Sequence, residues 1–157
     1  MNYQQYMIEQ TRAAAEEAFR NAKAVPAEKL TWQAADTSRS VLDICRELAQ
    51  CPKWAEDIIR NQEPEWNEET MAAIKKEAEQ WSSVEACQEE CNRRLSRLFE
   101  VYGEITDEQL KNTKWLPYDG GRDFTVKEMM DYPRWNFNWH SGQIAFIQTL
   151  YGDKAMY

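Results

Sequence analysis

An apolar stripe with helical spacing lies near the C-terminal end of the chain and carries its only histidine, His140. Apolar residues recur there every three or four positions, which places them on one face of an amphipathic helix. The stripe comprises Val126, Met129, Met130, Pro133, Phe137, His140, Ile144, Ile147 and Tyr151. Asn136 and Gln143 lie four residues before and three residues after His140, so this face also buries polar groups. Each buried polar group costs roughly 1 to 3 kcal/mol without a partner. The fold must therefore supply partners, water or an ion.

Length and charge limit the class of protein. The 157 residues suit one domain spanning residues 1–157. No apolar run approaches the ~20 residues of a membrane helix, and the sequence MNYQQYMIEQ lacks the order of a signal peptide. We therefore expect a soluble, cytoplasmic protein with no membrane partner. Nineteen basic and 27 acidic residues give a net charge of -8, which opposes binding to a phosphate backbone. Nucleic acid is not an expected partner.

Four cysteines could form two disulfides or a tetrathiolate zinc site, but their pattern favours reduced thiols in the core. These are Cys45, Cys51, Cys87 and Cys91. Cys87 and Cys91 are four residues apart within a helical apolar stripe, where thiols act as small hydrophobic groups. Structural zinc sites generally use tighter Cys-x-x-Cys spacing.

Helical periodicity dominates the whole chain and predicts an all-α fold. The expected long helices cover about 3–23, 40–58, 82–102 and 125–151, with a short acidic helix at 67–80. Either Ser38 or Ser40 can cap the second long helix. Pro52 should kink that helix, and Pro133 should bend the last one. Four long helices of this length favour a four-helix bundle.

Capping boxes, which pair a serine or threonine with an acid or amide three residues later, mark three further boundaries. Ser82 with Glu85 predicts the start of the third long helix, and Thr106 with Gln109 predicts a brief turn. The third pair is Thr125 and Glu128, at the start of the last helix. Between the second and the third of these pairs, residues 114–123 contain a proline and an Asp-Gly-Gly run, which predicts a turn-rich loop.

Four short segments stand in a distinctive order along the chain. They are Val25-Pro26-Ala27-Glu28-Lys29-Leu30-Thr31-Trp32, Ser40-Val41, Thr125-Val126-Lys127-Glu128 and His140-Ser141-Gly142-Gln143-Ile144. Together they resemble the DinB-like (YfiT-like) helical-bundle superfamily. The resemblance implies a four-helix bundle with an up-down-down-up arrangement, often dimeric, that holds a divalent metal through three histidines.

The resemblance also implies where such a metal would bind. One ligand of the superfamily comes from the second long helix, and two come from a His-x-x-x-His pair on the last. On this sequence those positions fall on Glu47, Asn136 and His140. One carboxylate, one amide and one imidazole form a harder and weaker set than three imidazoles, for zinc, nickel or manganese. The alternative is a metal-free, hydrogen-bonded cluster of the same residues, which is favoured because asparagine poorly replaces a metal-binding imidazole.

Two function classes follow from these alternatives. The resemblance implies a metal-dependent thiol transferase-like enzyme that acts on a low-molecular-weight thiol or another small molecule. The second class is a non-catalytic homodimeric bundle whose polar cluster is structural or binds a small ligand. Trp139 and Gln143 are the candidate ligand-binding residues. Trp135 and Trp139 are expected to pack in the core, although they could instead wall a pocket or a dimer interface. Gly142 could let another helix approach closely, and the alternative is a tolerated packing glycine.

Overall fold

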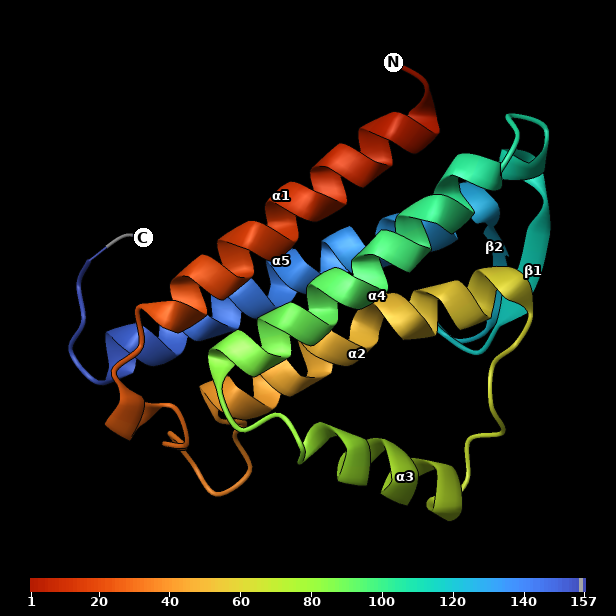
Figure 1. Cartoon of the computed structure of the whole chain (residues 1–157). Helices are drawn as coiled ribbons and strands as arrows, with labels where there is room; N and C mark the ends of the chain where they lie inside the picture. The colour runs from red at the N-terminus through yellow and green to blue at the C-terminus, as the bar shows by residue number, and fades with distance from the viewer. Residues whose placement is uncertain (156) are drawn as a thin grey trace.

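The computed structural model describes residues 1–155 and 157 and is dominated by four long helices. They are α1 (Tyr3–Lys23), α2 (Val41–Arg60), α4 (Val84–Glu104) and α5 (Val126–Leu150). Helices α1 and α5 run in one direction and α2 and α4 in the other, so the order along the chain is up-down-down-up (Figure 1). Helix α5 packs against both α1 and α2, while α4 packs against α2 and α1. The predicted all-α bundle is confirmed, with one small β-hairpin added.

The core lies where the apolar faces of these four helices meet. Its largest fully buried side chains include Tyr102, Phe19, Phe137, Met7, Ile44, Leu48, Leu98 and Met130. Four cysteines, Cys45, Cys51, Cys87 and Cys91, are buried as free thiols. Burial raises the pKa of the Cys87 thiol to about 11, despite the neighbouring Arg46. The prediction of reduced core cysteines is confirmed. No helix in the described part of the chain is both long and apolar enough to cross a membrane.

Capping residues fix where the helices begin. Ser40 caps α2, and its hydroxyl oxygen accepts a hydrogen bond from the Asp43 backbone N–H at 3.2 Å. The predicted capping box of Thr125 and Glu128 is present at the start of α5. The prediction for α4 is wrong by one residue, because the helix begins at Val84, and Ser83 rather than Ser82 caps it. This register buries Val84 in the core, and tertiary packing here overrides the local capping signal.

A short antiparallel hairpin replaces the loop predicted at residues 114–123. Strands β1 (Thr113–Leu116) and β2 (Arg122–Thr125) pair with Thr113 opposite Thr125 and Leu116 opposite Arg122. Two 3₁₀ turns, η1 (Ala27–Lys29) and η2 (Gln109–Lys111), complete the connections. Neither Thr-Lys-Trp-Leu nor Arg-Asp-Phe-Thr alternates strictly between polar and apolar residues, so the sequence did not reveal the hairpin.

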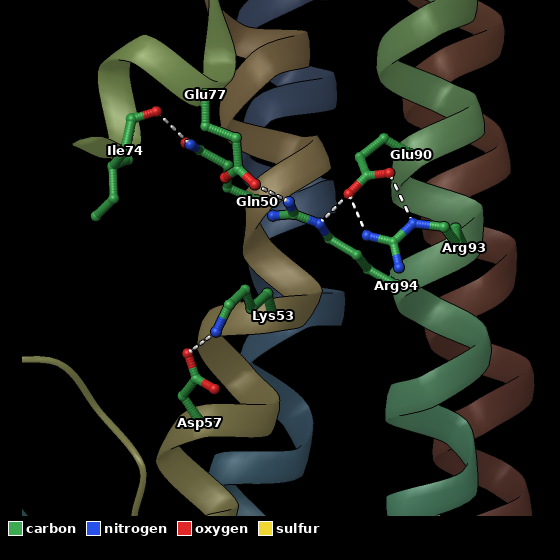
Figure 2. Close-up of polar contacts among 8 residues, drawn as sticks. All are labelled: Gln50, Lys53, Asp57, Ile74, Glu77, Glu90, Arg93 and Arg94. Carbon is green, nitrogen blue, oxygen red and sulfur yellow. Dashed lines mark hydrogen bonds and ion pairs between the residues drawn. The ribbon is translucent and has the colours of Figure 1, made fainter. Parts of the chain in front are cut away.

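Helix α3 (Glu68–Ala78) lies outside the bundle, alongside α2 (Figure 1). Polar contacts attach it to the bundle, because Ala78 is its only fully buried residue. The Gln50 side-chain amide donates to the Ile74 carbonyl at 2.9 Å. The buried Arg94 guanidinium donates to Glu77 on α3 at 2.7 Å and to Glu90 on its own helix at 2.5 Å (Figure 2). Helix α3 forms one side of a groove beside α2, which it lines with Met71, Ile74 and Lys75.

Candidate functional site

The candidate site centres on a contact between α2 and α5. The Nε2 atom of His140 lies 2.8 Å from the Oε1 atom of Glu47. His140 is only 4% exposed, and the Glu47 side chain is 20% exposed. A carboxylate can only accept hydrogen bonds when ionised, so Nε2 of His140 is the donor. The helical phase of α2 therefore turns Glu47 toward α5.

The second ring nitrogen of His140 is also occupied. Its Nδ1 atom lies 2.6 Å from the Oε1 atom of Gln143, one turn further along α5. Because each ring nitrogen has a partner, the orientation of the imidazole ring is fixed. Gln143, predicted as a ligand-binding residue, therefore contacts His140 directly and acts on its orientation.

Arg39 is the residue that the sequence reasoning missed. It lies immediately before the N-cap of α2, and its guanidinium forms an ion pair with the Oε2 atom of Glu47. One carboxylate thus holds His140 with one oxygen and Arg39 with the other. The sequence did contain a signal for this contact. Arg39 directly precedes the N-cap residue Ser40 and lies about two helical turns before Glu47, which faces inward.

These contacts determine the charge of Glu47. Burial by itself would raise the pKa of its carboxyl. The hydrogen bond from His140 and the nearby charges of His140 and Arg39 outweigh burial and lower the pKa to about 2. Glu47 is therefore an ionised carboxylate near neutral pH.

Asn136 is the third residue of the predicted set, but its side chain makes only a weak contact with Glu47. Its Nδ2 atom lies 3.5 Å from Oε1 of Glu47, at the limit of a hydrogen bond. Its Oδ1 atom is buried and has no hydrogen-bond partner among the described residues. The structure therefore brings Glu47, Asn136 and His140 together, as expected, and leaves one amide oxygen free.

The contacts that Glu47 and His140 already make compete with binding of a divalent metal. Two ligands of one ion at about 2.0 to 2.1 Å lie roughly 2.8 to 3.4 Å apart, so the 2.8 Å between Glu47 and His140 is at the short end of that range. The hydrogen on Nε2 would have to leave, and the Arg39 guanidinium places a positive charge beside the carboxylate. Within residues 1–155 and 157, no three His, Cys, Asp or Glu side chains are grouped to hold an ion.

Two grooves flank the cluster, and Arg39 lines both. The larger groove, of about 980 Å³, lies between α2, α3 and the hairpin, with Glu47 in its wall. Its aromatic lining consists of Trp54, Trp66, Tyr118 and Tyr132. The smaller groove, of about 580 Å³, includes Trp139, Gly142 and Gln143.

Two expectations for α5 are wrong. Trp135 and Trp139 do not pack in the core: they are 52% and 57% exposed, with their rings stacked 5.6 Å apart. Both tryptophans lie one turn apart on the solvent-facing side of the helix, about 100° round from the buried residue that follows each, Asn136 or His140. Gly142 does not admit another helix of the described chain, because no neighbouring atom of it comes within 4 Å of an added Cβ.

Comparisons with known proteins identify the fold. Neither a protein-family model nor a curated protein sequence matches the chain. YfiT from Bacillus subtilis, described as a probable metal-dependent hydrolase with an unusual four-helix bundle topology, superimposes with a TM-score of 0.75 at 13% identity. The match covers 95% of this chain and 87% of YfiT.

Two further solved structures are similar at the same level of identity. A conserved protein from Enterococcus faecalis matches with a TM-score of 0.71 and 13% identity, over 96% of this chain and 97% of that one. The colibactin self-resistance protein ClbS, solved in complex with double-stranded DNA, matches with a TM-score of 0.67 and 13% identity, over 93% and 95%. The chain therefore has the DinB/YfiT-like four-helix-bundle fold that the sequence resemblance implied.

Proposed function

We propose that the protein binds a small organic molecule in the larger groove and does so without a resident metal. One observation supports this proposal above all. The Glu47 carboxylate contacts both His140 and Arg39, and it lies in the wall of an aromatic-lined groove. The cluster acts as the polar end of the binding site, and the aromatic side chains form its apolar walls.

The groove has the size and composition of a ligand site. Small-molecule pockets generally occupy about 300 to 1,000 Å³ and combine apolar walls with a few polar groups. The groove measures about 980 Å³. Trp66 and Tyr118, from the α2–α3 connection and the hairpin, are 51% and 49% exposed and face it from different elements. Their exposed rings provide area that a flat or apolar ligand would cover.

The charged groups define the chemistry of the ligand's other end. The ionised Glu47 carboxylate accepts hydrogen bonds, whereas the Arg39 guanidinium, 53% exposed, pairs with anionic or carbonyl oxygens. A ligand with an apolar body and a head that carries both a donor and an acceptor suits this arrangement. A low-molecular-weight thiol remains one candidate of this class.

The test uses 8-anilinonaphthalene-1-sulfonate, which has an aromatic body and an anionic head. Titration into ¹⁵N-labelled protein should shift the indole cross-peaks of Trp54 and Trp66, and Arg39→Ala should weaken the affinity several-fold. The indole of Trp115, which is 61% exposed on β1 and does not line this groove, serves as the internal control. Equal shifts at all three indoles, or no dependence on Arg39, would contradict the proposed groove.

The second candidate function is a metal-dependent, thiol transferase-like enzyme. One observation favours it: the buried Oδ1 atom of Asn136 has no partner among the described residues. YfiT, which shares the fold, is described as probably metal-dependent. Elemental analysis of protein purified without an affinity tag distinguishes the two candidates. The metal-independent proposal expects far less than one metal per chain, while stoichiometric metal that is lost in both Glu47→Ala and His140→Ala would support the enzyme.

A further inference from the structure

A buried arginine outside the candidate site has hydrogen-bond donors that no described residue uses. Arg94 on α4 is 5% exposed. Its Nη2 atom donates to Glu77 at 2.7 Å, and its Nε atom donates to Glu90 at 2.5 Å. The Nη1 atom is buried and has no hydrogen-bond partner among the described residues, and Figure 2 shows one guanidinium nitrogen of Arg94 that no dashed line reaches. A buried N–H group without an acceptor is costly, so this atom indicates a place where an acceptor binds.

The Arg94 guanidinium is held in a fixed orientation. It lies over the ring of Trp81, with 5.2 Å between its Cζ atom and the ring centroid. Two carboxylates hold it from different helices, Glu77 from α3 and Glu90 from α4. Because these contacts fix the guanidinium before a ligand arrives, binding does not have to immobilise a long side chain.

Arg94 lines a cavity of about 390 Å³ between α2, α3 and the connection that joins them, which we call the Arg94 cavity. Asp57 of α2 lines it as well. The Oδ2 atom of Asp57 accepts a hydrogen bond from Lys53 at 2.5 Å, whereas its Oδ1 atom accepts none from the described residues. The cavity thus has one unused donor and one unused acceptor, and its volume lies within the range of small-molecule sites. Its apolar walls are formed by Trp54, Pro64, Ala73 and Ile74.

The charges around the Arg94 cavity disfavour an anion as its occupant. Its lining has two basic side chains, Lys53 and Arg94, and three acidic ones, Asp57, Glu69 and Glu77. Since the Arg94 charge is already balanced by its two carboxylate partners, a further carboxylate or phosphate would meet net negative charge. An uncharged acceptor suits Nη1 better. A carbonyl oxygen has two lone pairs and no hydrogen, so it meets this requirement.

We propose that the Arg94 cavity binds a small uncharged amide. Its carbonyl oxygen accepts a hydrogen bond from Nη1 of Arg94, and its N–H donates to Oδ1 of Asp57. An amide group carries both the acceptor and the donor that the cavity lacks, and the apolar body of the ligand lies against Trp54. Neither Glu47 nor Arg39 lines this cavity, so the proposal does not depend on the function proposed above.

Benzamide is the probe, and benzoate and acetophenone are its matched controls. Benzoate has the same shape with an anionic head, and acetophenone keeps the carbonyl oxygen without the N–H. Titration of benzamide into ¹⁵N-labelled protein should shift the guanidinium Nη1 resonance of Arg94, which the Arg94→Lys variant assigns. Benzamide should bind at least about fivefold more tightly than either control, as expected for one hydrogen bond. An Arg94 resonance that does not move, or a control that binds as tightly as benzamide, would overturn the proposal.

A cavity-filling variant tests the location and leaves Arg94 in place. Trp54 and Ile74 also line the larger groove, whereas Ala73 lines only the Arg94 cavity of these two. Ala73→Trp should weaken benzamide binding several-fold, because the new ring occupies the cavity. Ala72→Trp, at the neighbouring exposed position that lines neither, should bind benzamide as the wild type does. Thermal unfolding checks that both variants fold, and equal affinity of the two folded variants would exclude this cavity as the benzamide site.

Discussion

Replacing Glu47 by glutamine should destabilise the protein and change how its stability depends on pH. Glutamine keeps the shape of the side chain and still offers an oxygen to Nε2 of His140. It removes the negative charge, however, and directs an amide NH₂ or an uncharged oxygen at the Arg39 guanidinium. The charged hydrogen bonds at both ends of the carboxylate become weaker or are lost.

The magnitude follows from the pKa of Glu47. Its contacts lower the pKa from 4.5 to about 2 in the folded protein. At 1.36 kcal/mol per pKa unit, the ionised form contributes about 3 kcal/mol to the free energy of unfolding. Because part of the carboxylate faces solvent, a loss of about 2 to 3 kcal/mol at pH 7 is expected for Glu47→Gln.

The sign of the pH dependence can be worked out from the same shift. The folded-state pKa lies below the unfolded value, so this stabilisation is complete above pH 4.5 and is lost as the pH falls toward 2. About 2 kcal/mol of it should disappear between pH 7 and pH 3 in the wild type. The Glu47→Gln variant should lack this component of the acid-induced loss.

Urea unfolding followed by tryptophan fluorescence at pH 7, 5 and 3 measures these quantities. Glu16→Gln, at an exposed position on α1, is the matched control and should leave both the stability and its pH dependence nearly unchanged. Surface substitutions usually change the free energy of unfolding by less than roughly 0.5 kcal/mol. If Glu47→Gln changed it by no more than that at pH 7, the cluster would not stabilise the bundle. An acid-induced loss of the same size in Glu47→Gln and in the wild type would likewise contradict a stabilising role of the Glu47 carboxylate.

Three further predictions concern other parts of the molecule. Arg94→Ala removes the buried contact to Glu77, so the amides of α3 should exchange faster with solvent while those of α1 are unaffected; unchanged α3 exchange would contradict the anchoring role. Gly121→Ala should destabilise by about 1 to 3 kcal/mol in thermal unfolding, because Gly121 has a φ of 83° and an added Cβ would lie 2.8 Å from the Trp115 ring. Gly103→Ala, in open space within α4, should instead be neutral or stabilising. No retardation of double-stranded DNA is expected in a low-salt mobility assay, given the charge of -8, even though ClbS was solved with DNA; a salt-sensitive shift would overturn this expectation.

Periodic features made the bundle predictable from sequence. The apolar stripe of α5 places Phe137, His140 and Ile144 in the core as expected, and the capping pair at Thr125 marks the first residue of the helix. Both signals are local, because they depend on spacing within a single helix. The family resemblance then supplied the direction of each helix, which no single helix encodes.

Features that depend on several elements were harder to predict. Arg39 reaches Glu47 from the end of the α1–α2 connection, which contacts the start of α2 through a hydrogen bond from the Leu42 N–H to the Leu30 carbonyl. The exposure of Trp135 and Trp139 depends on which side of α5 is left without a neighbour, and a large aromatic ring is ordinarily taken for core. Likewise, the one-residue shift of the α4 cap to Ser83 was decided by which side chains the bundle buries.

In the proposed function, Glu47 and not a metal occupies Nε2 of His140. A long-range ¹H–¹⁵N correlation spectrum of the imidazole tests it directly, since the chain has one histidine and its signals need no assignment by mutation. We predict that Nε2 carries a hydrogen and that its ¹⁵N shift is unchanged by stoichiometric zinc or nickel. An Nε2 without a hydrogen, or one whose signal moves or broadens with stoichiometric metal, would contradict the account.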